Sequence, residues 1–162
     1  PLEGVLLNEL KGQGPSYDFI ELFNTGEASV DLSGCYVADD SANRVAFPLG
    51  ASIAAGGFVL VRLSQPIASG EVTTCDGFSP CYDGTWGISS AGEAIFFRSA
   101  TNKVLDALAY PAQNSPSGVL DGQSFGRHPD GAETFGAVTI SPGNPNSPLL
   151  FRRTLHCVAE PS

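Results

Sequence analysis

Short apolar segments separated by clusters of glycine, proline, asparagine and aspartate are the feature that most constrains how this 162-residue chain can fold. The segments follow one another at intervals of about ten residues, a spacing typical of a β-sandwich or barrel. With 19 glycines and 12 prolines, the chain is unsuited to a helical bundle or a coiled coil. We therefore expect one all-β domain, a sandwich of about eight to nine short strands with long Gly/Pro-rich loops. The expected strands are residues 5–10, 17–24, 30–32, 35–38, 44–47, 58–63, 94–99, 104–110 and 123–127.

Two regions interrupt this rhythm. Residues 65–86 show no clear periodicity, and a structureless segment of such length inside a compact domain usually has a staple or a function. Residues 111–148 are rich in proline and glycine, so we expect them to wrap around the surface of the sandwich. We divide the chain into a sandwich over residues 1–148, with an insertion at 65–86, and an extension over residues 149–162. The extension should be packed on the sandwich or tied to it.

Four cysteines allow three disulfide pairings, of which we favour Cys75 with Cys81 and Cys35 with Cys157. The first bridge would staple the 65–86 insertion, and the second would tie the C-terminal extension to the sandwich. The alternative is that Cys35 is a small buried apolar residue and Cys157 is a free thiol. The cysteine spacings do not match a zinc site. Disulfides would place the chain in an oxidising compartment, outside the cell or in the cell envelope.

The charge balance narrows the kinds of partner. The chain has 17 acidic and 8 basic residues, which gives a formal net charge of −9 at pH 7. Affinity for nucleic acids depends on Lys and Arg that neutralise phosphates, so we do not expect direct nucleic-acid binding. We expect a protein or cell-surface partner instead. The sequence has no apolar run long enough to predict a membrane span, and it does not define an oligomeric state.

Several spaced motifs resemble the lamin tail domain, a family with an immunoglobulin-like β-sandwich fold. The resemblance begins with residues 5–9 (VLLNE), 19–24 (FIELFN) and 30–34 (VDLSG). It continues with residues 36–40 (YVADD), 47–48 (FP), 53–58 (IAAGGF), 125–127 (FGR), 129–131 (PDG) and 141–146 (SPGNPN). Each motif is short, but the series follows the family's order from residue 4 to residue 147.

The resemblance implies a bacterial version of the domain. It further implies an exported module, since bacterial members of the family often accompany nuclease, phosphatase or other extracellular domains. The chain departs from the family pattern at Cys35, which replaces the usual aromatic residue after Ser-Gly. The 65–86 insertion and the 149–162 extension also lie outside the pattern. A disulfide between Cys35 and Cys157 would explain the replacement and the extension together.

Glu21 and two histidines are the candidates for catalysis. Glu21 lies between Phe19 and Phe23 on one face of an expected strand, where a carboxylate needs hydrogen-bond partners. We expect backbone N–H groups or an arginine to supply them. The alternative, a general acid with a raised pKa, requires a second carboxylate or a nucleophile nearby. Since neither His128 nor His156 stands in the context of a hydrolase nucleophile, we expect no enzymatic activity and assign no catalytic residue.

Calcium is the metal that the acidic turns fit best. Asp39, Asp40 and Asn43 cluster in one turn, and Asp76 and Asp83 lie in the 65–86 insertion. Calcium takes about six to eight oxygen ligands, which turns can supply, although the spacing matches no EF-hand. The alternative is that these aspartates are solvated and form hydrogen bonds within their own turns. We expect no cofactor other than this candidate calcium ion.

Phe78, Tyr82 and Trp86 form the candidate binding surface, because they stand among small polar residues in the 65–86 insertion. The alternative is that these rings fold back and cap the sandwich. With the resemblance, the sequence favours a non-catalytic binding or structural module of an exported bacterial protein, with an unknown ligand. The second hypothesis is an accessory domain that recruits a substrate, such as nucleic acid or a glycan, for an attached hydrolase or nuclease.

Overall fold

The computed structural model describes residues 1–12, 17–41, 43–64, 72–75, 78–112, 120 and 122–149, with the backbone alone for residues 72–75, 78 and 79. This part of the chain contains a short 3₁₀ helix, Leu2–Gly4, and fourteen strands. The first seven strands are β1 (Val5–Lys11), β2 (Phe19–Asn24), β3 (Val30–Asp31), β4 (Tyr36–Asp39), β5 (Arg44–Ala46), β6 (Ser52–Ile53) and β7 (Phe58–Arg62). The others are β8 (Val72–Cys75), β9 (Phe78–Asp83), β10 (Glu93–Arg98), β11 (Val104–Tyr110), β12 (Gln123–Arg127), β13 (Phe135–Thr139) and β14 (Ser147–Pro148).

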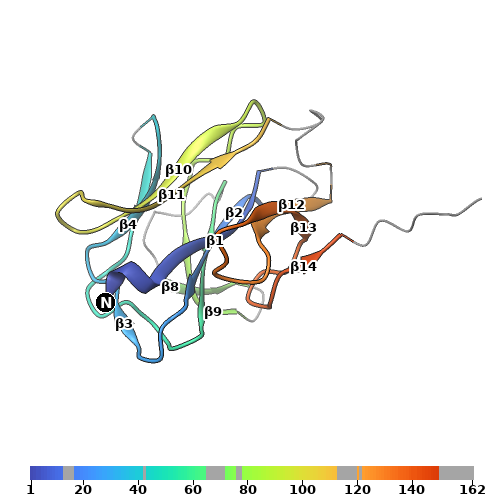
Figure 1. Ribbon diagram of the computed structural model, residues 1–162. Coiled ribbons are helices and arrows are strands. Elements are labelled where there is room, and N and C mark those ends of the chain that lie inside the picture. Colours follow the sequence, from blue (N-terminus) through green and yellow to red (C-terminus); the bar gives the residue numbers. More distant parts are fainter. Residues whose placement is uncertain are drawn as a thin grey trace, which may run out of the picture.

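The strands form three sheets, which confirms the all-β prediction. The largest sheet has eight strands in the order β14-β13-β12-β1-β2-β7-β9-β8, and the second has four in the order β11-β10-β4-β5. Strands β3 and β6 pair separately. In Figure 1 the four-stranded sheet lies above the chain's N-terminal end, and β12 to β14 lie on the opposite side of the molecule. No helix in the described ranges could cross a bilayer, since they hold only one turn of 3₁₀ helix.

The core lies between the eight-stranded and the four-stranded sheets, as in an immunoglobulin-like β-sandwich. Ile20 and Leu22 of β2 enter it from one sheet, and Val37, Ile95 and Phe97 of β4 and β10 enter it from the other. All five side chains are fully buried. Because side chains alternate along a strand, the residues between them occupy the outer faces of the two sheets. These two outer faces hold the charged groups considered below.

A β-bulge in β1 sets which of its side chains face outward. In the pairing of β1 with β2, Leu7 lies opposite Leu22 and Glu9 lies opposite Glu21, so Asn8 is an extra residue. Strict alternation without this bulge would place the carboxylate of Glu9 in the core together with Leu7. The bulge instead brings the two glutamates onto the outer face of the eight-stranded sheet.

The 65–86 insertion differs from the structureless loop that the sequence predicted. It contains β8 and β9, which pair with each other antiparallel, and β9 also pairs with β7 in parallel, so the insertion widens the large sheet. β13 and β14 likewise extend this sheet from the Pro/Gly-rich region, where only fragments of strand were expected. These four strands are short and do not alternate regularly between apolar and polar residues, so periodicity in the sequence does not predict them. Apart from Leu149, the 149–162 extension lies outside the described residues.

The cysteines correct one expected bridge. Cys35 is a free thiol, 2% exposed, that packs in the main core, so the predicted link to Cys157 is absent from the structure. Cys35 therefore fills space as a small apolar residue, which was the alternative to the bridge. Cys157 lies outside the described residues. Cys81 is buried and disulfide-bonded, while the side chain of Cys75 is not described, so the Cys75–Cys81 pairing stays a prediction.

Candidate functional site

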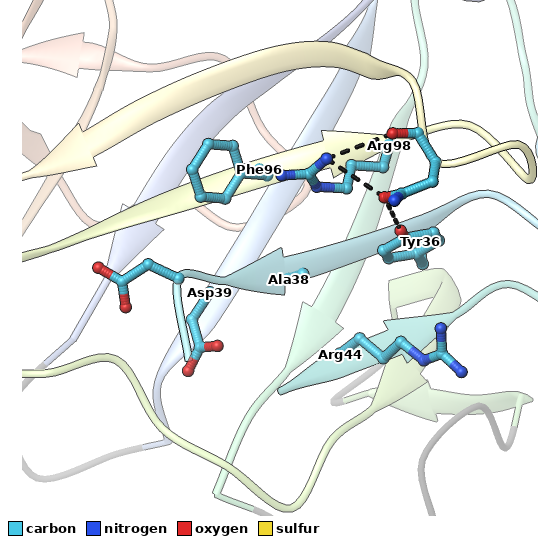
Figure 2. A pocket seen from close by; sticks show the side chains of 8 residues that line it. Tyr36, Ala38, Asp39, Arg44, Phe96 and Arg98 are labelled. Carbon is cyan, nitrogen blue, oxygen red and sulfur yellow. Dashed lines mark hydrogen bonds between the residues drawn. The ribbon is translucent and has the colours of Figure 1, made fainter. Parts of the chain in front are cut away.

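An open groove of about 670 Å³ lies on the outer face of the four-stranded sheet. Its floor is Ala38 of β4, which lies opposite Arg44 of β5 on one side and Phe96 of β10 on the other. Tyr36 of β4 and Arg98 of β10 form the next row along the sheet. Figure 2 shows Arg44 and Arg98 on either side of β4. The small alanine between longer side chains is what hollows the sheet face.

Arg98 is held in place by neighbours on its own hairpin. Its guanidinium lies 4.8 Å from the centre of the Phe96 ring, and Nη1 donates hydrogen bonds to the carbonyl oxygen and Oδ1 of Asn102, at 3.3 and 3.2 Å. The Tyr36 hydroxyl donates to the same Oδ1 at 2.5 Å (Figure 2). Asn102 has a φ of +66°, a left-handed conformation that asparagine tolerates better than most residues. The turn therefore directs one amide group at both the arginine and the tyrosine.

Arg44 lies with its guanidinium 5.5 Å from the centre of the Tyr36 ring. A guanidinium on an aromatic face keeps the edge that carries its N–H donors free for another group. Within the described residues, neither Arg44 nor Arg98 has a carboxylate within 4.0 Å, although acidic residues outnumber basic ones two to one along the chain. By contrast, Arg62, Lys103 and Arg127 each have such a partner. The groove thus gathers two cationic groups with donors to spare.

The other end of the groove is acidic. Asp39 and Asp40 line it, and Asp40 is exposed. The carboxylate of Asp39 accepts hydrogen bonds from the backbone N–H of Asn43 at 2.8 Å and from its Nδ2 at 2.7 Å. Burial raises the pKa of the neighbouring Glu93, and the negative charges of Asp39 and Asp40 raise it further. The groove is therefore polarised, with guanidinium groups at one end and carboxylates at the other.

The predicted calcium ligands are not brought together as a set. Asp83 forms a two-point ion pair with Arg62, at 2.7 and 3.0 Å, while Asp76 lies outside the described residues. Asp39 is engaged by Asn43, as in the alternative of turn aspartates that bond within their own turn. No group of three or more His, Cys, Asp or Glu within the described ranges could hold a metal ion. The candidate calcium ion is not tested by the structure, and a calorimetric test at the acidic end of the groove is given in the Discussion.

Of the three aromatic residues expected on a binding surface, Tyr82 lies in the core and Trp86 is half-buried. Tyr82 is 2% exposed and packs edge-on against Phe47 in the core, with ring centres 5.0 Å apart. Trp86 is partly buried against the same core. Because β9 joins the large sheet, these rings cap the sandwich, which was the alternative reading of the sequence. The side chain of Phe78 lies outside the described part.

The outer face of the large sheet holds a second polar set, which is buried. Glu9 and Glu21 are fully buried there beneath residues 140–146, which we call the C-terminal strap. Glu21 accepts hydrogen bonds from the backbone N–H of Gly143 at 2.6 Å and from Nδ2 of Asn8 at 3.1 Å. This confirms the expectation that a backbone N–H would satisfy it.

Glu9 is satisfied in a similar way. It accepts from the Ser124 hydroxyl and from the backbone N–H and hydroxyl of Ser141, at 3.0 and 3.1 Å. Burial raises the pKa of Glu9, and burial with the nearby charges of Glu9 and Asp130 raises the pKa of Glu21 to about 8. Glu21 thus has the raised pKa and the second carboxylate that a general acid would need. Both groups are nevertheless covered by the strap and bonded to it, so the cluster holds the chain together and offers no path to a substrate.

Neither histidine is among the described residues that line the groove. His128 shares a hydrogen bond of 2.9 Å between Nδ1 and the backbone oxygen of Asn146, next to the buried cluster. His156 lies outside the described residues. Sequence reasoning missed the groove residues Tyr36, Arg44, Phe96, Arg98 and Asn102. A usable signal was the placement of two of the chain's few basic residues on short strands that also carry aromatic residues.

The packing of the eight-stranded sheet against the four-stranded sheet is that of an immunoglobulin-like β-sandwich. This chain belongs to the lamin tail domain family, whose model matches residues 2–112. The family consists of non-catalytic immunoglobulin-like domains. The match includes all the strands that form the groove and ends after β11, so β12 to β14 lie beyond it. A search of curated proteins found no match to the chain.

Proposed function

We propose that this lamin tail domain is a non-catalytic binding module of an exported bacterial protein, and that the groove on its four-stranded sheet is the binding surface. The observation that carries the proposal is the pair Arg44 and Arg98, ordered on aromatic rings and free of carboxylate partners within the described residues. Ordering two arginines without an internal carboxylate partner contributes little to folding. It does prepare donors for a ligand from outside, because little side-chain freedom remains to be lost on binding.

The size and openness of the groove agree with this role. Its volume of about 670 Å³ falls within the range of small-molecule and oligomer sites. Its walls come from strands and two short turns, which hold side chains more firmly than long loops do. If the domain accompanies a hydrolase or nuclease, the same groove would recruit that enzyme's substrate.

Export is part of the proposal. The buried, disulfide-bonded Cys81 favours an oxidising compartment, outside the cell or in the cell envelope. The net charge of −9 suits a module that stays dispersed outside the cell and makes direct binding to nucleic acid unfavourable.

The proposal is tested by affinity electrophoresis of the whole chain through gels that contain one probe each. The probes are an acidic polysaccharide, a neutral glucan, poly-glutamate and double-stranded DNA. We expect at least one probe other than DNA to retard the wild-type chain, and the double variant Arg44→Met/Arg98→Met to migrate as it does in an empty gel. Methionine keeps an unbranched apolar stem of similar bulk, so the sheet face should stay packed.

Lys103→Met is the matched control, because Lys103 is an exposed cation outside the groove, 3.9 Å from Glu3. This control should be retarded like the wild type. Retardation of the double variant equal to that of the wild type, or no retardation of the wild type by any probe, would refute the groove as the binding surface.

A further inference from the structure

We infer that the ligand of the groove is an acidic saccharide chain, one that carries carboxylate groups among neutral hydroxyls, as a uronic acid oligosaccharide does. The inference rests on the proposed function, since it names the ligand class of the same groove. It follows from three features of the site, namely the free guanidinium edges, the acidic far end and the absence of accessible backbone groups on the sheet face.

The guanidinium groups are suited to bind an anion whose oxygens lie in one plane, such as a carboxylate. The fork of N–H donors on arginine matches a carboxylate in two-point contact, and Arg98 is already oriented by Asn102. Arg44 of β5 and Arg98 of β10 lie on the two strands that flank β4 and are offset by two residues along them, which places their stems roughly 12 Å from each other. Side chains of this length can bind one carboxylate jointly or two carboxylates on nearby units of one chain.

The acidic end excludes a ligand that is anionic throughout. Asp39 and Asp40 would repel a dense polyanion such as a nucleic acid, but they can accept hydrogen bonds from hydroxyl groups. Asp40 is exposed and can turn toward a ligand, whereas Asp39 is already bound to Asn43. A ligand that presents a carboxylate to one end and hydroxyls to the other complements both ends of the groove.

The position of the groove favours a saccharide over a peptide. The backbone groups of β4 and β10 pair with their neighbouring strands, so the sheet face presents side chains only. An extended peptide gains most of its affinity by adding a strand at a sheet edge, through backbone hydrogen bonds that this face cannot provide. A saccharide has no such backbone, and side-chain contacts to its hydroxyls and carboxylates suffice.

The test is isothermal titration of the wild-type chain with oligogalacturonate, with the fully methyl-esterified oligomer of the same length, and with a poly-glutamate peptide. Esterification removes the charge and keeps the ring hydroxyls, so it isolates the role of the carboxylates. We expect binding of oligogalacturonate, at least tenfold weaker binding of the ester, and at least tenfold weaker binding of the peptide. Arg44→Met/Arg98→Met should lower the affinity for oligogalacturonate at least tenfold, while Lys103→Met should leave it within about twofold. Melting curves of both variants confirm that they are folded.

Several outcomes separate the two proposals. Equal binding of the ester, or tighter binding of the peptide, with loss of that binding in the arginine double variant would overturn the acidic saccharide and leave the groove as the binding surface. Binding of oligogalacturonate that survives in the double variant would overturn both. Heparin, a densely sulfated saccharide, serves as a final probe. Binding of heparin as tight as that of oligogalacturonate would show general attraction to anions and would also overturn the inference.

Discussion

The two outer faces of this sandwich use the same pattern of residues to different ends. On the large sheet, Phe19, Glu21 and Phe23 of β2 alternate with core residues, and on the small sheet Phe96 and Arg98 of β10 do the same. The first face, the closed face, is covered by the C-terminal strap, and Glu21 is fully buried. The second, the open face, is covered by nothing within the described residues, and its arginines line a groove.

The difference lies in what supplies the partners of the charged groups. On the closed face, Asn146 of the strap donates from Nδ2 to the backbone oxygens of Asn8 and Arg127, at 3.2 and 2.9 Å. Gly126 makes room for that amide, since a Cβ at this position would lie 2.8 Å from it. On the open face, the guanidinium groups meet aromatic rings and one asparagine. A charged residue on a strand therefore stabilises the fold where the chain returns to cover it, and is available to a ligand where it does not.

The same substitution on the two faces gives the largest contrast. Arg127 beside the closed face donates to the backbone oxygen of Leu7 at 2.7 Å and to Asp106 at 2.9 Å. Arg127→Met should lower the free energy of unfolding by about 3–5 kcal/mol, because it removes the cationic partner of the largely buried Asp106 carboxylate and the hydrogen bond to the Leu7 carbonyl oxygen. Arg44→Met should change it by less than about 0.5 kcal/mol. Urea denaturation measures both, and equal losses would show that Arg44 also has a structural role.

The pH dependence of the free energy of unfolding should be set mainly by Glu21, which is buried on the closed face. The pKa of Glu21 is about 8 in the folded protein and 4.5 when unfolded, so the folded state holds the proton more tightly. The free energy of unfolding should be highest below about pH 4.5 and should fall as the pH rises to about 8, by at most about 1.4 kcal/mol per pH unit. Glu21→Gln should flatten this slope, while Asp40→Asn on the open face should leave it. Thermal melts from pH 4 to pH 9 give the slope, and an unchanged slope in Glu21→Gln would assign it to another group.

A smaller effect is expected from two asparagines, one on each face. Asn146→Ala should destabilise the protein by about 1–3 kcal/mol, because it removes two buried hydrogen bonds that hold the strap. Backbone amides of residues 140–146 should then exchange faster with deuterated solvent. Asn102→Gly keeps the left-handed turn and should have little effect on stability. If exchange in the strap does not change in Asn146→Ala, other contacts hold the strap.

Local patterns in the sequence were enough to predict nine of the fourteen described strands, but not β6, β8, β9, β13 and β14, and not the contacts between distant strands. The alternation around Ile20 and Leu22 located β2 and placed Glu21 on the outer side. Its partner Gly143 lies 122 residues away, and a local pattern contains no sign of that contact. The groove was missed for the same reason, because it exists only where β4 lies between β5 and β10.

In the 65–86 insertion, residues were assigned to a binding surface although the fold uses them elsewhere. Tyr82 and Trp86 were assigned to a surface because their neighbours are small and polar, yet β9 pairs with β7 and turns Tyr82 into the core. Parallel pairing of this kind depends on a long connection, and the sequence of the insertion alone does not reveal it. The bulge at Asn8 is similar, since one extra residue changed which face Glu9 occupies.

Calcium provides the smallest test, at the acidic end of the open face. A site of the affinity found in extracellular modules, with a Kd of about 1 mM, would stabilise the folded protein by about 1 kcal/mol at 5 mM calcium. That gain would raise the melting temperature by about 2–4 °C. We expect a rise of less than about 1 °C, because Asn43 already occupies the carboxylate of Asp39 and Asp40 alone offers too few oxygens. Differential scanning calorimetry with 5 mM calcium and then with chelator measures the shift. A rise of several degrees that disappears in Asp40→Asn would show that the open face binds a cation as well as the proposed anionic ligand.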